Sequence, residues 1–197
     1  MATGPEYIEV PKTEVLDYLL RGGFLPAERQ GAIKSADEQT NARILKDLEK
    51  LENAPINVPE GGLRVLIKGT HVNLRSSLWE ILQLGAELIV EHQNPIAVAL
   101  AVGNAVRTIS DKITRINDPI ELLVAKSIVR VAAAKKRSGR VLIVPEVSVD
   151  EITSDLLAQG LPDAPSNLSD LLAHLRGEDI IQGVFHDGRG PYYVVTF

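Results

Sequence analysis

Residues 95–116 carry the sequence PIAVALAVGNAVRTISDKITRI, and this stretch predicts one long apolar helix. Asn94 is placed to cap the helix, and Pro95 takes its first position, where the missing N–H group costs nothing. One continuous apolar face is formed by residues three and four positions apart: Ile96, Ala99, Leu100, Gly103, Val106, Ile109 and Ile113. The first half is also apolar on its opposite face. We therefore expect this helix to be buried on several sides, in the middle of a helical bundle.

A second helix is predicted on either side of this segment. Residues 74 to about 91 form the first, with Asn73 as its cap. Residues 119 to about 136 form the other, and Asp118 before Pro119 repeats the helix-start signal. Its inward side is expected to comprise Ile120, Leu123, Val124, Ile128 and Val131. Short connections between consecutive apolar helices indicate antiparallel neighbours.

The N-terminal residues predict a helical arm, 1–54. It contains a short helix after Thr13 and a long helix from about residue 27 to 53, which is charged in its first half and amphipathic only from Ile44. Such a helix is either a solvated arm or a surface that meets another copy of the chain, and both alternatives stay open. A linker rich in Pro and Gly then leads to a short strand and an apolar helical region, 63–116.

Composition limits the functional classes. The chain has 197 residues, of which 45% are hydrophobic and only 4% aromatic, so the core must be aliphatic. The absence of cysteine excludes disulfides, thiolate metal sites and cysteine nucleophiles. A net charge of −5 gives no overall basic footprint for nucleic acid. The N-terminal residues lack the features of a secretory signal, and the uncharged window 92–106 is shorter than the ~20 residues of a membrane span. A cytoplasmic protein without a membrane span is expected.

The C-terminal residues predict a defined order of short elements. A strand at 141–144 is followed by Ser148 and Glu151, which form the S-x-x-E capping box of a helix. After a turn, Asn167 is placed to cap a second short helix that ends near Gly177. Two β-rich runs, joined by residues 187–190, then indicate a hairpin.

Helix, strand, helix, turn, helix and hairpin, in this order over about residues 117–197, resemble the winged helix-turn-helix family. The resemblance implies a mainly α (α+β) fold, with a helical bundle followed by a C-terminal winged-helix-like domain that has a small antiparallel sheet. It places 148–159 as the first helix of the motif, 167–176 where the recognition helix lies, and 188–190 at the wing tip. The turn at 160–166 is longer than the three or four residues usual in this motif. Residues 1–116 carry no such resemblance.

The resemblance also implies contacts to nucleic acid or to a protein partner. The candidate residues are Lys135, Lys136, Arg137, Arg140, Asn167, Ser169, His174, Arg176 and Arg189. The exposed side of 167–176 is nearly neutral to acidic, whereas helices that meet phosphates draw their affinity from Lys and Arg. The basic cluster at 135–140 fits a solvated helix end that complements its dipole better than it fits a phosphate contact. Protein docking or self-association is therefore favoured over DNA binding.

Catalysis and cofactor binding have little support in the sequence. The four histidines are scattered, no metal-ligand spacing occurs, and no nucleophile or phosphate-loop motif is present. We expect a non-enzymatic interaction or regulatory protein without a cofactor, which self-associates into a homo-oligomer. The alternatives are a DNA-binding transcriptional regulator and a structural subunit of a larger assembly.

Overall fold

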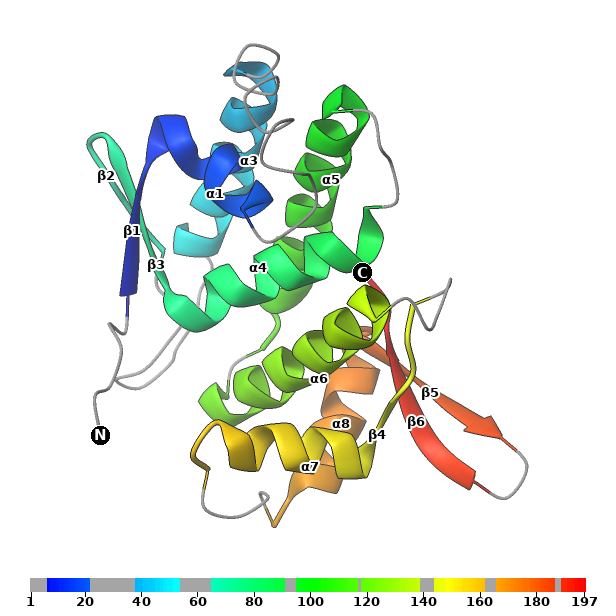
Figure 1. Cartoon of the computed structure of the whole chain (residues 1–197). Coiled ribbons are helices and arrows are strands. Elements are labelled where there is room, and N and C mark those ends of the chain that lie inside the picture. Colours follow the sequence, from blue (N-terminus) through cyan, green and yellow to red (C-terminus); the bar gives the residue numbers. More distant parts are fainter. Residues whose placement is uncertain are drawn as a thin grey trace.

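The computed structural model describes residues 7–21, 38–53, 65–90, 95–116, 118–138, 144–161, 166–186 and 189–197. These residues form helices and two small antiparallel sheets of three strands each, which confirms the predicted mainly α (α+β) class. Figure 1 shows an N-terminal half and a C-terminal half, with helix α4 lying across the middle of the molecule above α6. None of the helices in the described ranges combines the length and the apolar character that a membrane-spanning segment requires.

The elements follow one another in this order. The N-terminal half contains β1 (Tyr7–Pro11), α1 (Val15–Leu20), α3 (Glu38–Asn53), β2 (Leu66–Lys68), β3 (His71–Arg75), α4 (Ser76–Ile89) and α5 (Pro95–Ile113). The C-terminal half contains α6 (Pro119–Arg137), β4 (Val147–Ser148), α7 (Val149–Ala158), α8 (Leu168–Gly177), β5 (Ile181–His186) and β6 (Arg189–Val195).

The N-terminal sheet has the strand order β1-β3-β2, and both outer strands run antiparallel to β3. Val72 in β3 lies opposite Val10 of β1 and Ile67 of β2. Asn73, predicted to cap the following helix, lies inside β3, so that prediction was wrong and α4 begins only at Ser76. The cause is the alternation of buried and more exposed side chains along 71–75, which suits a strand with one covered face.

Helix α3 packs against α5 and α1. Its apolar side chains Ile44, Leu48 and Leu51 are fully buried, three and four residues apart. The pairing of β1 with β3 also joins the N-terminal residues to the elements that follow. Where it is described, the segment 1–54 thus shares a core with the apolar helical region, in contrast to the solvated arm considered above. Residues 27–37 and the linker at 54–62 lie outside the described residues.

Helix α5 lies between α3 and α4 and packs against both. Its buried side chains are Val98, Ala99, Val102, Ala105, Val106, Ile109, Ser110 and Ile113. The remaining side is open: Leu100 is 46% exposed, and Asn104 and Arg107 are exposed beside it. The helix is thus buried on the sides that face α3 and α4, as predicted, but Leu100, predicted on its continuous apolar face, is exposed. The predicted cap, Asn94, lies outside the described residues.

Helix α6 begins as predicted. The carboxylate of Asp118 accepts the backbone N–H of Ile120 at 2.7 Å, and Pro119 takes the first helical position. Ile120 itself is exposed, contrary to the prediction of an inward side chain. The next two residues, Glu121 and Leu122, are buried instead, and Glu121, which is 3% exposed, pairs with His174 of α8.

The C-terminal sheet has the strand order β4-β6-β5, so the first of its strands pairs with the last. The strand expected at 141–144 falls almost entirely outside the described residues, and β4 follows at Val147–Ser148. The predicted capping box is confirmed: Ser148 Oγ accepts the N–H of Glu151 at 3.3 Å, and Glu151 Oε2 accepts the N–H of Ser148 at 2.8 Å.

Helix α8 buries its four leucines, Leu168, Leu171, Leu172 and Leu175, against the C-terminal core. Asn167 stands at the N-cap position, but its side chain makes no capping hydrogen bond, so this detail of the prediction was wrong. The backbone carbonyl of Asn167 instead accepts the N–H of Asp170 at 2.9 Å.

The two halves are joined by α4 packed on α6 and by contacts at the end of the chain. The Lys112 ammonium of α5 donates to the carbonyl and the hydroxyl of Thr196, each at 2.9 Å. The ring of Phe197 lies against α4, since a Cβ at Gly85 would stand 3.2 Å from it. Figure 1 accordingly shows the C-terminus in the middle of the molecule.

Candidate functional site

The basic cluster at the end of α6 binds groups of α4 and of the segment that leads into α7, while the Arg137 side chain remains 52% exposed. Lys135 Nζ donates to the Glu146 carbonyl at 2.7 Å and forms an ion pair with Glu151 at 2.6 Å. The Arg137 guanidinium forms a two-pronged hydrogen-bonded pair with the Glu87 carboxylate, which raises the pKa of Arg137. Arg140 lies outside the described residues.

Lys136 belongs to the same cluster on α6 and contacts the C-terminal end of α4. Its ammonium donates to the carbonyls of Glu87 at 3.1 Å, Leu88 at 2.7 Å and Val90 at 3.4 Å. Carbonyls at a helix C-terminus lack helical partners and carry partial negative charge, so a lysine there stabilises the helix end. The cluster therefore acts as a clamp between the two halves.

We predict that Lys136→Met lowers the free energy of unfolding by about 1–2 kcal/mol, because charged hydrogen bonds to these carbonyls are lost. Urea unfolding followed by circular dichroism measures the change. Lys68→Met, at an exposed position of β2, is the control and is expected to stay within about 0.5 kcal/mol of wild type. Equal stabilities of the two variants would contradict the clamp.

The remaining candidate contacts lie on α8 and the hairpin. Asn167 and Ser169 are exposed at the start of α8, and Arg189 is exposed at the start of β6. Arg176 lies beside β5, where its Cδ and Nη1 atoms would stand 3.9 Å from a Cβ at Gly183. Arg176 is thus brought next to the hairpin, whereas the cluster at 135–137 faces α4.

His174 pairs with Glu121 at the start of α6. Burial raises the pKa of Glu121, against the lowering effect of the hydrogen bond with His174. The same hydrogen bond raises the pKa of His174, because the neighbouring carboxylate favours the charged imidazolium. His174 is therefore a structural partner for a buried carboxylate as well as an exposed side chain.

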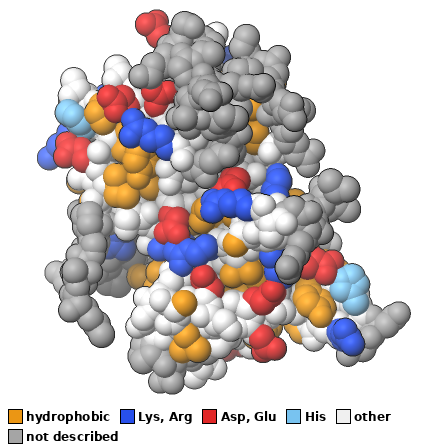
Figure 2. Space-filling model, in the orientation of Figure 1, with side chains coloured by type: hydrophobic (Ala, Val, Ile, Leu, Met, Phe, Trp, Pro, Cys, Tyr) orange, Lys and Arg blue, Asp and Glu red, His pale blue; other side chains and the backbone are white. Residues whose placement is uncertain are grey.

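A second ionic network crosses from α4 to α6 and α7. Glu80 Oε1 accepts Arg130 Nε at 2.7 Å, and Glu80 Oε2 pairs with Lys126 Nζ at 2.9 Å. Arg130 also reaches Asp155 of α7 at 3.5 Å. Figure 2 shows positive and negative side chains alternating across the middle of this face. The acidic and basic side chains of this network balance one another, so no uncompensated positive charge remains to bind an external phosphate.

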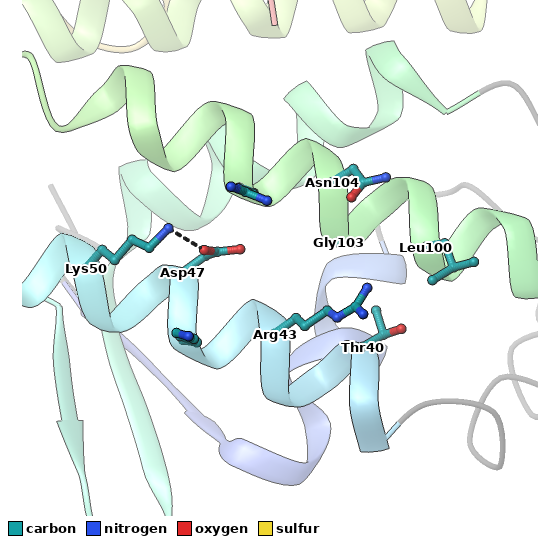
Figure 3. Close-up of a pocket in the computed structure, with 9 residues that line it drawn as sticks. Thr40, Arg43, Asp47, Lys50, Leu100, Gly103 and Asn104 are labelled. Atoms are coloured by element: carbon teal, nitrogen blue, oxygen red, sulfur yellow. Dashed lines mark ion pairs between the residues drawn. The ribbon is translucent and has the colours of Figure 1, made fainter.

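A groove that was not predicted from the sequence lies between α3 and α5, with a volume of about 460 Å³ (Figure 3). Its described lining comprises Thr40, Arg43, Lys46, Asp47, Lys50, Leu100, Gly103, Asn104 and Arg107. Gly103 lies where the two helices approach, since a Cβ there would stand 3.2 Å from the Thr40 methyl group. The close approach lets side chains from both helices border one hollow.

The groove is positively charged in a protein of negative net charge. Its described lining has four cationic side chains and one carboxylate. Only Lys50 is paired with that carboxylate, at 2.8 Å from Asp47 (Figure 3). Arg43, Lys46 and Arg107 have no ion-pair partner among the residues that the structure describes. The spacing 43, 46 and 50 could have been found as a basic stripe in the sequence, but Arg107 joins it only through the packing of α5.

The described residues contain no group of three His, Asp or Glu side chains placed to hold a metal ion. The charged side chains instead form the clamp, the α4–α6–α7 network and the α3–α5 groove. Compared with known proteins, the chain matches no protein-family model, no curated protein and no solved structure.

Proposed function

We propose that the chain is a non-enzymatic interaction protein that docks another protein through a winged-helix-like domain at 117–197. The order α6, β4, α7, α8, β5, β6 supports this assignment, because it is the order on which the resemblance rests. The pairing of β4 with β6 supports it as well, since it joins the strand before α7 to the hairpin.

The main support for this proposal is an exposed face formed by Arg176 of α8 and Phe185 of β5. We call it the α8–β5 face. Phe185 is 69% exposed, and its ring lies beside Gly183, next to Arg176. β5 is an edge strand, so its outer side has no strand partner among the described residues. Aromatic and arginine side chains supply much of the binding energy at protein interfaces, and an open strand edge is a frequent docking point.

The same face fits DNA less well. Binding to duplex DNA draws on cations that replace counterions along the phosphates. Lys135, Lys136 and Arg137 already bind carbonyl and carboxylate groups of the protein itself, and α8 carries Asp170 among its exposed side chains. The DNA-binding alternative predicts salt-dependent retardation of a duplex in a gel, and absence of retardation at low salt would end it.

A photocrosslinking experiment tests the docking proposal. The change is Phe185→p-benzoylphenylalanine, with Leu157→p-benzoylphenylalanine, at an exposed position of α7, as the matched control. We expect a covalent adduct from position 185 in cells and none from position 157, and a decrease of about fivefold or more when Arg176→Glu is added.

Mass spectrometry of the adduct then decides between a second copy of this chain and another protein. Sedimentation of the purified chain provides an independent check, because a monomer at all concentrations removes self-association. Adducts of equal yield at positions 185 and 157, or an adduct that ignores Arg176→Glu, would contradict docking through the α8–β5 face.

A further inference from the structure

The groove between α3 and α5 has the form of an anion site. Arg43, Lys46 and Lys50 lie on one face of α3, because they are three and four residues apart. They extend over about 10 Å of helix, given a rise of 1.5 Å per residue. Arg107 of α5 borders the same hollow from the other side. Cations from two helices therefore converge on one volume of about 460 Å³.

The charge balance sets the charge of a matching ligand. Four cationic side chains and one carboxylate leave the described lining with an excess of three positive charges. Like charges within a Debye length repel one another, and an anion placed between them relieves this repulsion. The two arginines offer planar forks that suit phosphate oxygens, whereas the lysines act as point charges.

We infer that this groove binds a diphosphate group, the chemistry shared by inorganic pyrophosphate and the phosphate end of an organic diphosphate. The multiple negative charges of a diphosphate match the excess positive charge of the groove lining. Leu100, 46% exposed at the end of the groove near Thr40, provides an apolar contact for an organic part (Figure 3). The site is separate from the α8–β5 face and does not depend on it.

The surroundings favour a small anion over a nucleic acid. Asp47 lies in the groove, and Asp111 stands 4.0 Å from Lys50 at one end of it. Asp111 thus bounds the positive zone at the Lys50 end, and Asp47 interrupts it from within. A polynucleotide backbone that extends beyond this zone meets negative charge, which weakens its binding.

Titration calorimetry with the full chain tests the inference, using pyrophosphate, ADP, orthophosphate and a short single-stranded oligonucleotide at low salt without divalent metal. We expect pyrophosphate and ADP to bind, and orthophosphate to bind about tenfold more weakly because it engages fewer cations. ADP binding tighter than pyrophosphate identifies an organic diphosphate, and the reverse order identifies the inorganic ion.

Charge-matched variants locate the site. Arg43→Gln and Arg107→Gln are each expected to weaken pyrophosphate binding by about tenfold or more, whereas Arg189→Gln, on the distant hairpin, changes it by less than about twofold. Pyrophosphate is also expected to raise the melting temperature of wild type and of Arg189→Gln but not of Arg107→Gln. Absence of pyrophosphate binding, equal effects of all three variants, or an oligonucleotide that binds more tightly than pyrophosphate would overturn the inference.

Discussion

Replacing Trp79 with alanine is expected to lower the free energy of unfolding by about 3–5 kcal/mol, the range for large buried aromatic side chains. Trp79 of α4 is fully buried. Its Nε1–H donates to the Ile8 carbonyl of β1 at 3.1 Å, and its ring meets the Tyr18 ring of α1 edge-on at 5.0 Å. One side chain thus connects three elements of the N-terminal half.

Urea unfolding at fixed pH measures this loss of stability. The Trp79→Phe variant separates the contribution of the buried ring from that of the hydrogen bond to the Ile8 carbonyl. The phenylalanine variant keeps an aromatic ring but leaves the Ile8 carbonyl without its donor, so a smaller loss of about 1–3 kcal/mol is expected. This variant also keeps the prediction testable where alanine prevents folding. Phe185→Ala, at an exposed aromatic, serves as the control. An alanine variant of Trp79 within about 1 kcal/mol of wild type would contradict the central place of this side chain.

Several features that depend on neighbouring residues were predicted correctly from the sequence, although the caps assigned to Asn73 and Asn167 were wrong. The Asp118-Pro119 start of α6 and the Ser148–Glu151 capping box depend on contacts within one helical turn, so their residue types are sufficient to identify them. The leucines of α8 follow from helical periodicity in the same way. Local chemistry therefore accounts for most element boundaries in the C-terminal half.

Features that depend on distant partners were not predicted. β3 alternates over only five residues, and it is its pairing with both β1 and β2 that identifies it. In the sequence, Lys136 belongs to what looks like an exposed basic helix end. Its carbonyl partners belong to α4, which is far away in the sequence. The α3–α5 groove likewise needs the close approach at Gly103. Sequence patterns report which face of an element is apolar, and the fold decides which charges meet.

Glu121 is the buried charge with the largest expected consequence for stability. Its side chain is enclosed at the start of α6, and His174 is the hydrogen-bond partner that the structure gives its carboxylate. A buried carboxylate that loses its partner retains its desolvation penalty without compensation. His174 is half exposed, so solvent takes over part of the lost interaction. We therefore expect His174→Ala to lower the free energy of unfolding by about 2 kcal/mol near pH 6, below the usual range for fully buried pairs.

The pH dependence of this loss has a definite sign. Folding raises the pKa of His174 above its ordinary value of 6.5 and that of Glu121 above 4.5, so the folded state binds protons more tightly at both groups. The stabilisation from His174 is complete below pH 6.5 and is lost as pH rises through its raised pKa in the folded protein. The difference between wild type and His174→Ala should accordingly be larger near pH 6 than near about pH 8.5.

Urea unfolding of both proteins at these two pH values measures the difference, with His71→Ala, at an exposed histidine of β3, as a control expected to show a small difference at both. The double variant Glu121→Gln/His174→Ala separates the partners: because it has no buried charge at position 121, it should be more stable than His174→Ala alone. A recovery of stability in the double variant would show that the unpaired Glu121 carboxylate causes the loss in His174→Ala, rather than the missing packing of the imidazole. A double variant as unstable as His174→Ala, or a loss independent of pH, would show that His174 stabilises α8 by packing alone.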